Sequence, residues 1–344
     1  MARACGFELA GVARAEASED RERYHNWVRG GYAGEMRYLT DRRADVRDDP
    51  RNLLASACSV ICVGKLYNTP HVEADVPEAG WISRYAWGDD YHDEMRRGLQ
   101  QLDALIREGA GQPVESKICV DTAPLLERSY ARAAGLGWIG KNTCLINQQS
   151  GSWFFLGELL VSISIEPDKP PPDRCGTCTR CIDACPTAAI VKNGSGYGID
   201  SRLCISYFTI ELRGPVPEQL RGPIGHHVFG CDICQDVCPW NRSAPVTSDP
   251  AYQPRHYAPP LAALADVTEQ EFREMFRKTP VSRARYAGFL RNVAIAMGNA
   301  GSEKFRGPLE KLAGSSYPLV AEHARWGIAQ LDRATRTAQC EPRA

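Results

Sequence analysis

Residues 175–186 read CGTCTRCIDACP, and residues 231–239 read CDICQDVCP. The first stretch spaces its cysteines as C-x2-C-x2-C-x3-C-P, which is the bacterial pattern for cubane iron–sulfur clusters. The second stretch keeps a C-x2-C pair and a cysteine–proline step, and Cys204 lies between the two stretches. Two such blocks predict a bacterial ferredoxin-like module with two [4Fe–4S] clusters, and therefore a path for electrons through the protein.

In a two-cluster module, the cysteine before the proline ligates the other cluster. The spacing therefore predicts that one cluster is held by Cys175, Cys178, Cys181 and Cys238. The second cluster receives Cys185, Cys231 and Cys234, with Cys204 as its fourth ligand, or His226 or His227 in the rarer case of imidazole ligation. Two structural zinc sites are the alternative interpretation of paired C-x2-C motifs. Disulfides are disfavoured, because clustered C-x2-C pairs in a chain without a recognisable signal peptide indicate metal or redox sites.

The length of 344 residues, 43% of them hydrophobic, predicts two or three domains with a sizeable core. No apolar run reaches 18 residues, so we expect no membrane span and a cytoplasmic protein. The net charge of −1 conceals a basic region, since residues 281–344 carry ten Lys/Arg and five Asp/Glu. Such a region could contact a phosphate backbone or could be an ordinary solvated helical surface, and charge alone leaves both open.

The first part of the chain alternates predicted strands and helices. Residues 59–67 (SVICVGKLY) and 153–165 are apolar, as in buried strands, while residues 93–107 have apolar side chains at helical spacing. A short strand over residues 118–120 ends at Asp121, and a helix is expected to follow to about residue 134, with Thr122 as its N-cap. This alternation predicts an α/β domain over residues 1–165.

Proline-rich stretches at residues 167–173 and 245–260 delimit a predicted cluster domain over residues 166–245. The remaining residues, 246–344, are predicted to be all-α, with amphipathic segments at 286–297, 303–312 and 319–331. Short amphipathic helices in series are typical of HEAT-type units, and a plain helical bundle is the alternative.

The two clusters require a second redox group or substrate site. No GxGxxG opens a βαβ unit, because the glycines at 135, 137 and 140 follow a helix and precede a strand, so a Rossmann site is unsupported. Asp90-Tyr91-His92 begins like the DxHxxG motif of cobalt-ligating histidines, but Met95 stands in place of the glycine. A corrinoid with histidine on cobalt is therefore not expected.

Five stretches together resemble the epoxyqueuosine reductase family. They are YAWGDDYH (85–92), VDTAPLLER (120–128), AGLGWIGKNT (134–143), LCISY (203–207) and GCDICQDVCPWN (230–241), and the resemblance covers about residues 1–335. It implies a cobalamin-binding first domain, with the cofactor base-off and without a histidine ligand, two [4Fe–4S] clusters and HEAT-like helices that bind tRNA. It also implies reduction of epoxyqueuosine to queuosine in the wobble position of GUN anticodons, the last step of queuosine biosynthesis. A low-potential donor is expected to supply the electrons, and a monomer is expected because nothing in the sequence requires more.

The resemblance also implies site residues. Asp121 matches the proton donor, which would need its protonated form favoured by burial or by a nearby negative charge. The positions that match cobalamin contacts are Arg47, Arg84, Asp121, Leu145, Leu156, Ser206 and Tyr207. For the arginines a surface salt bridge, and for the leucines simple core packing, are the alternatives. Tyr91 and His92 could line the substrate side, although His92 could equally be an ordinary core histidine.

Binding of tRNA would rest on phosphate contacts and base stacking, with the basic C-terminal helices and residues 221–229 as candidates. Two other functions compete with this one. A reductive dehalogenase-like corrinoid reductase of a small molecule would use the same cofactors, and a pure electron carrier would need only the cluster module. Six cysteines have no predicted partner and are expected to be mostly buried free thiols: Cys5, Cys58, Cys62, Cys119, Cys144 and Cys340.

Overall fold

The computed structural model describes residues 1–70, 78–194 and 196–340, and its contacts divide the chain into two compact units. Unit 1 comprises Met1–Thr69, Asp90–Ser201 and Ile233–Tyr252, and unit 2 comprises Pro70–Asp89, Arg202–Asp232 and Gln253–Ala344. This division does not follow the predicted boundaries near residues 165 and 245. Separate folding of three consecutive domains therefore stays a prediction.

Unit 1 is built on a four-stranded sheet in the order β1-β2-β7-β4. Its strands are β1 (Leu9–Arg14), β2 (Ser59–Leu66), β4 (Ser116–Cys119) and β7 (Phe154–Val161). The strands predicted within residues 59–67, 118–120 and 153–165 are confirmed, to within a few residues at their ends. Every pairing is antiparallel, whereas alternating strands and helices more often build a parallel sheet. The hydrophobic pattern of a strand indicates that the strand is buried, but it does not show in which direction the neighbouring strand runs. The antiparallel pairing could therefore not be predicted from the sequence.

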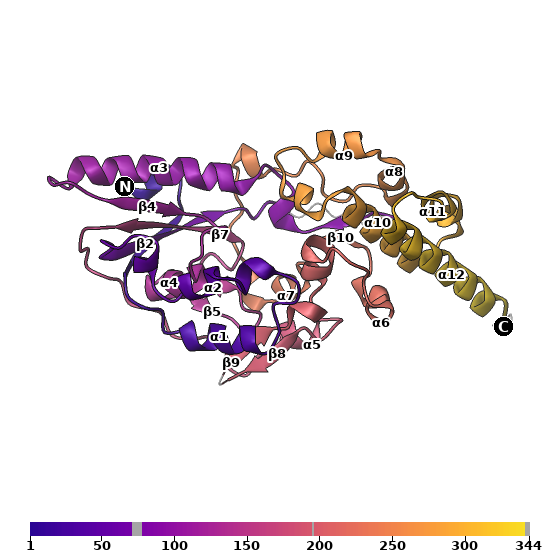
Figure 1. Ribbon diagram of the computed structural model, residues 1–344, viewed down its shortest axis with the longest axis horizontal. Helices are drawn as coiled ribbons and strands as arrows, with labels where there is room; N and C mark the ends of the chain where they lie inside the picture. Colours follow the sequence, from indigo (N-terminus) through magenta and orange to yellow (C-terminus); the bar gives the residue numbers. More distant parts are fainter. Residues whose placement is uncertain (71–77, 195, 341–344) are drawn as a thin grey trace. The chain divides into compact units, whose positions relative to one another are not determined.

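Helices α3 (Tyr91–Gly109) and α4 (Glu127–Ala133) cover opposite faces of this sheet (Figure 1). Helix α3 buries Met95 and Leu99 against β7, and the helix predicted over residues 93–107 is confirmed. The approach is close, because a Cβ at Gly157 would lie 2.9 Å from Met95 Cε and 3.0 Å from Leu99 Cδ1. Alternation along β7 then turns its next residue, Glu158, toward the face that α4 covers.

The segment between β4 and α4 differs from the prediction. Helix α4 begins at Glu127, and Thr122 is not its N-cap. Asp121 has a left-handed φ of 47°, and the Thr122 N–H donates to the Val120 carbonyl at 2.5 Å. These turns replace the first part of the helix that Thr122 was expected to cap. Asp121 therefore lies on a tight loop at the end of β4.

The rest of unit 1 carries the cysteine blocks. Its remaining elements are α1 (Arg21–Arg29), α2 (Arg43–Val46), the hairpins β5 (Trp138–Ile139) with β6 (Leu145–Ile146) and β8 (Ile190–Asn193) with β9 (Gly196–Ile199), and the short helices α5 (Arg180–Asp183) and α7 (Ile233–Asp236). Helices α5 and α7 pack against each other, which brings parts of the two cysteine blocks together.

Unit 2 is mainly helical. It contains α6 (Glu218–Arg221), α8 (Leu261–Asp266), α9 (Glu269–Met275), α10 (Tyr286–Ala300), α11 (Arg306–Ala313) and α12 (Pro318–Cys340), together with the parallel pair β3 (Trp81–Ile82) and β10 (His227–Phe229). Helix α10 is buried from Gly288 to Gly298 and packs on α8 and α12, and α11 packs on α12 (Figure 1). The helices predicted at 286–297, 303–312 and 319–331 are thus present, and among the described residues no helix has the length and apolar character to cross a membrane.

Candidate active site and iron–sulfur ligands

The four cysteines predicted to hold the first cluster gather in unit 1. Cys238 is buried and packs with Trp138, Ile146 and Trp240, and the partly buried Cys175 joins the same group. Burial raises the pKa of Cys181 to about 11, and the neighbouring sulfurs of Cys175, Cys238 and Cys178 add to the effect. Cys238 of the second block therefore lies with the cysteines of the first block. Iron binding would displace the thiol protons from such a group.

Lys141 and Asn142 hold the cysteine loops in place. The Lys141 ammonium donates to the backbone carbonyls of Gly176 and Cys178, both at 2.8 Å. The Asn142 amide donates to the carbonyl of Cys234 at 3.1 Å. Both residues belong to the 134–143 stretch, so its chemical role is to position ligand segments of both blocks, which the sequence reasoning did not identify.

The cysteines predicted for the second cluster come from both units. Cys185 and Cys234 belong to unit 1, and Cys204 and Cys231 belong to unit 2. Cys204 precedes a π-helical turn over Tyr207–Glu211, and the Phe208 N–H donates to the Cys204 carbonyl at 3.1 Å. The grouping of these four cysteines stays a prediction. Within the described residues, no three His, Cys, Asp or Glu side chains converge as ligands of a single metal ion would.

Asp121 and His92 meet at the end of β4. His92 Nε2 lies 3.2 Å from Asp121 Oδ2, and His92 Nδ1 lies 2.6 Å from Asp90 Oδ1. Partial burial by itself lowers the pKa of His92, but the hydrogen bonds to Asp121 and Asp90 outweigh it and bring the pKa to about 9. His92 is therefore an imidazolium between two carboxylates at neutral pH. The Asp121 side chain is 39% exposed, so it lacks the deep burial that was one expected way of favouring its protonated form.

Tyr91 extends this corner of the site. Its ring stacks on Phe155 at 4.2 Å with an interplanar angle of 5°, and lies 4.2 Å from the His92 ring. The predicted association of Tyr91 and His92 with Asp121 is thus present in the geometry. Their role toward a substrate stays a prediction.

A cavity of about 460 Å³ opens in unit 1, and this volume is typical of small-molecule sites, roughly 300–1,000 Å³. Asp121 and His92 do not line it; Glu127, which accepts from the Asp121 N–H, does. Its lining combines aromatic rings with cations: Tyr24, Trp27, Tyr197, Arg23, Arg47 and Arg128. The predicted contact residue Arg47 is 5% exposed and lies over the Tyr24 ring at 5.9 Å. A surface salt bridge, the alternative for Arg47, is therefore not what the structure shows.

The other predicted cofactor contacts are placed differently. Leu145 and Leu156 pack in the apolar cluster of unit 1, in agreement with the core-packing alternative. Arg84, Ser206 and Tyr207 belong to unit 2. The Arg84 guanidinium lies 5.3 Å from the Trp87 ring, and Tyr207 is buried with its ring edge toward Phe208. A common binding role for these residues stays a prediction.

The sequence analysis did not identify two carboxylates near the site. Glu158 is fully buried on β7, and Glu127 is the first residue of α4. Burial raises the pKa of each, and each is raised further by a neighbouring carboxylate, Asp121 for Glu127 and Glu127 for Glu158. The signal was present in the sequence, because Glu158 interrupts the otherwise apolar strand FFLGELLV.

Several basic residues considered for tRNA binding are internal. Arg221 is buried and bonds to the Val216 carbonyl and Glu322, and Phe229 of the same loop is fully buried. Arg291 is also buried. Exposed cations of the C-terminal helices, such as Lys311, pair with acidic residues. The basic excess of residues 281–344 is therefore only partly a surface charge.

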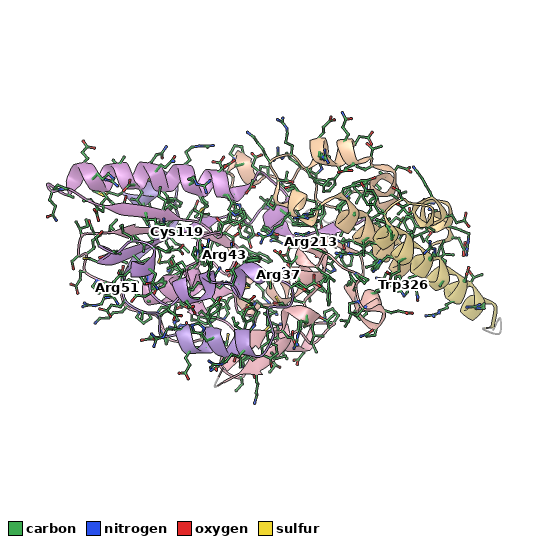
Figure 2. All side chains as sticks on the ribbon, viewed as in Figure 1. Arg37, Arg43, Arg51, Cys119, Arg213 and Trp326 are labelled. Atoms are coloured by element: carbon green, nitrogen blue, oxygen red, sulfur yellow. The ribbon has the colours of Figure 1, made fainter. Side chains whose placement is uncertain are left out.

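The cysteines without a predicted partner fall into two groups. Cys5, Cys62 and Cys119 are buried free thiols as expected, with Cys119 labelled in Figure 2. Cys58 is exposed and Cys144 is half-buried, so burial describes most but not all of this group. The side chain of Cys340 lies outside the described part of the chain.

Comparisons with known proteins are consistent with this arrangement. Residues 174–241 match the family model "4Fe-4S double cluster binding domain", and residues 47–122 match "Epoxyqueuosine reductase QueG, DUF1730". The epoxyqueuosine reductase of Xanthomonas campestris is 41% identical over 96% of this chain and 94% of its own length. That of Escherichia coli K12 is 39% identical over 94% of this chain and 86% of its own length.

Solved structures are similar over the same extent. A crystal structure of epoxyqueuosine reductase with an epoxyqueuosine-modified tRNA-Tyr stem loop superposes with a TM-score of 0.89 at 28% identity, over 99% of this chain and 92% of that one. The Bacillus subtilis epoxyqueuosine reductase, solved with an aspartate catalytic loop swung out of the active site, gives 0.87 at 27% identity, over 99% of this chain and 92% of that one.

Proposed function

The chain belongs to the epoxyqueuosine reductase family, a family of oxidoreductases, and we propose that it reduces epoxyqueuosine to queuosine in the wobble position of GUN anticodons of tRNA. Removal of the epoxide oxygen as water consumes two electrons and two protons and leaves an alkene. The observation that carries the proposal is the 41% identity over nearly the whole chain.

The electrons enter through the double [4Fe–4S] domain, which the family model places over residues 174–241. We assign Cys175, Cys178, Cys181 and Cys238 to one cluster, supported by their gathering in unit 1. We assign Cys185, Cys204, Cys231 and Cys234 to the other cluster from their spacing. A low-potential donor would load the clusters with single electrons.

The cavity of unit 1 fits part of a cobalamin. Its aromatic rings suit a flat macrocycle, and Arg47, Arg23 and Arg128 suit the phosphate or amides of the cofactor periphery. When bound, the cofactor would supply low-potential electrons to the epoxide. Both ring nitrogens of His92 are engaged by carboxylates, which argues against His92 as a cobalt ligand. We propose the base-off form from the family resemblance. Arg84, Leu145, Leu156, Ser206 and Tyr207 are further proposed contacts.

Asp121 is the proposed proton donor to the epoxide oxygen, because a partly exposed carboxyl at the end of β4 can reach a substrate while its backbone stays fixed. Because the His92 imidazolium is paired with the Asp121 carboxylate at 3.2 Å from Oδ2, the proton that Asp121 passes to the leaving oxygen is supplied by His92 as that oxygen gains negative charge. One proton thus moves from His92 through Asp121 to the leaving oxygen, and solvent water supplies the second proton before that oxygen departs as water.

The proposed layout is an α/β cobalamin-binding region over residues 1–165, a ferredoxin-like region over 166–245 and HEAT-like helices over 246–344 that contact the tRNA. The serial packing of α8, α10, α11 and α12 supports the helical part. We propose that the protein acts as a monomer in the cytoplasm.

The experiment is a turnover assay with the anaerobically purified protein, reconstituted clusters, added cobalamin and a low-potential reductant. tRNA bearing epoxyqueuosine is the substrate, and mass spectrometry of its nucleosides should show the loss of one oxygen. Asp121→Asn should lower the rate by about 10²–10⁴-fold, the usual contribution of a general acid. No conversion by a protein loaded with both cofactors would refute the function and favour a corrinoid reductase of a small molecule.

A further inference from the structure

Three carboxyl groups of unit 1 form a row from the core to the active-site loop. Glu158 stands at the centre of the sheet, directly across from Cys62 on β2 and from Cys119 on β4. Glu127 of α4 faces Glu158, and the backbone of Asp121 is bonded to Glu127. The mechanism proposed above uses only the outermost of these carboxyls.

Glu158 is suited to carry a proton. It is fully buried, and within the described residues neither of its carboxylate oxygens has a hydrogen-bond donor of normal geometry. Helix α4, which begins with Glu127, packs on β7, and the Glu127 carboxyl is the acidic group that interacts with Glu158 from that helix. Two ionised carboxylates facing each other here would repel. Desolvation would penalise chiefly the charge on Glu158, because Glu127 is only half-buried and lines the cavity.

Glu127 is suited to carry the negative charge of the pair. Burial and the Asp121 charge raise the pKa of Glu127, while the Asp121 N–H, Arg128 and the His92 imidazolium offset part of that rise. Glu127 is half-buried and Glu158 fully buried, so the charge of the pair is better placed on Glu127. A single proton between Glu127 and Glu158 removes the repulsion, as in other close carboxyl pairs. Glu158 then donates to one oxygen of Glu127, and the other oxygen stays free to accept.

This other oxygen of Glu127 binds the backbone N–H of Asp121. The Asp121 N–H donates to Glu127 Oε1 at 2.5 Å, while the residue adopts a φ of 47°. A left-handed conformation in a residue other than glycine costs about 1–3 kcal/mol and persists only where the surroundings impose it. A hydrogen bond to a charged acceptor contributes about 1.5–3 kcal/mol, which is enough to offset that strain.

We propose that Glu127 and Glu158 form a carboxyl pair that shares one proton, and that this pair is the positioning device for Asp121. The positioning role rests on the proposed function, since it matters for catalysis only if Asp121 is the proton donor. The sharing of the proton is independent of that function.

Infrared spectroscopy tests the shared proton without turnover. In D2O at neutral pH, the difference spectrum of wild type minus Glu158→Gln should contain the C=O stretch of one protonated carboxylic acid. Subtraction removes any band from Asp232, another carboxyl whose pKa is raised by burial. The same band should persist in Asp121→Asn and in Glu115→Gln, a matched exposed control near the start of β4. Absence of the band from the difference spectrum overturns the pair.

Glu127→Gln provides a second reading if Glu158→Gln does not fold. Its amide would change the hydrogen bond that Glu158 makes, so the band should shift rather than vanish. A band that is unchanged in position means that Glu158 does not bond to Glu127, and overturns the proposal.

Single-turnover kinetics test the positioning. Glu127→Ala should lower the rate on epoxyqueuosine tRNA by about 10²-fold, the usual effect of a misplaced catalytic group, with unchanged tRNA affinity. Glu127→Gln should recover most of that loss, because its carbonyl can still accept from the Asp121 N–H. Full activity of Glu127→Ala alongside an inactive Asp121→Asn overturns the positioning role. Full activity of Asp121→Asn instead removes the proposed donor, while the infrared result still decides the pair.

Discussion

Replacement of Arg291 by methionine should destabilise unit 2 substantially. Arg291 lies on α10 with 1% of its surface exposed. Its Nη1 donates to the carbonyls of Leu212 at 2.9 Å and Gly214 at 2.8 Å, and its Nη2 donates to the carbonyl of Phe208. These carbonyls belong to the π-helical turn that follows Cys204 and to the chain just beyond it. Methionine fills a similar volume but leaves the three carbonyls without this donor.

The size of the effect follows from two opposing contributions. Hydrogen bonds to a charged group contribute about 1.5–3 kcal/mol each, so three of them amount to roughly 5–9 kcal/mol. Removing a buried charge recovers several kcal/mol of desolvation, which leaves a net loss of about 3 kcal/mol. At roughly 2–4 °C per kcal/mol, the melting temperature should fall by about 10 °C.

The assay is a thermal melt of the anaerobic, cluster-loaded protein. Arg325→Met, on the exposed side of α12, is the matched control and should change stability by less than about 0.5 kcal/mol. Arg291→Lys should fall between, because an ammonium keeps the charge but not the fork of donors. A melting temperature for Arg291→Met equal to that of the control would refute the reasoning.

Three further predictions concern the clusters, the imidazolium and the core. Cys175→Ala should lose the iron of one cluster, whereas the exposed Cys58→Ala should keep the iron of both, as iron and sulfide analysis will show. The pKa of His92 is raised in the folded state to about 9 from an ordinary value near 6.5. The contribution of the His92 imidazolium to the free energy of unfolding is therefore complete below pH 6.5 and is lost as the pH rises through 9. Urea unfolding should therefore show wild type and His92→Gln converging above pH 9, and a constant difference would contradict the assignment. Leu99→Ala should cost about 2–5 kcal/mol in the same assay, while Leu105→Ala on the exposed side of α3 should cost far less.

Sequence reasoning succeeded where the chemistry is local. Cysteine spacing predicted that Cys238 joins the first block, and apolar periodicity predicted β2, β7, α3 and α10. In each case the residues that decide the outcome are close in sequence or belong to a pattern with a single chemical use.

It failed where a side-chain contact that no sequence pattern shows decides the structure. Thr122 and the proline after it fit a helix start, but the hydrogen bond of Glu127 to Asp121 favours a tight loop there instead. Arg221 and Arg291 counted as surface charge, although both bind backbone carbonyls inside unit 2. A sequence pattern shows that a side chain is polar, but it does not show whether a buried hydrogen-bond acceptor lies within its reach.

The division of the chain has a consequence for its synthesis. The polypeptide passes from one unit to the other at residues 69–70, 89–90, 201–202, 232–233 and 252–253. Domains normally fold as they leave the ribosome, N-terminal first. Here the fold of unit 1 cannot be completed until Tyr252 has been synthesised. The predicted ligands Cys175, Cys178 and Cys181 lack their fourth partner until Cys238 has been added. The nascent chain therefore carries these three thiols without their predicted partner while the 57 residues from Ile182 to Cys238 are added. This makes the timing of iron delivery, and protection from oxygen during that interval, part of how this protein matures.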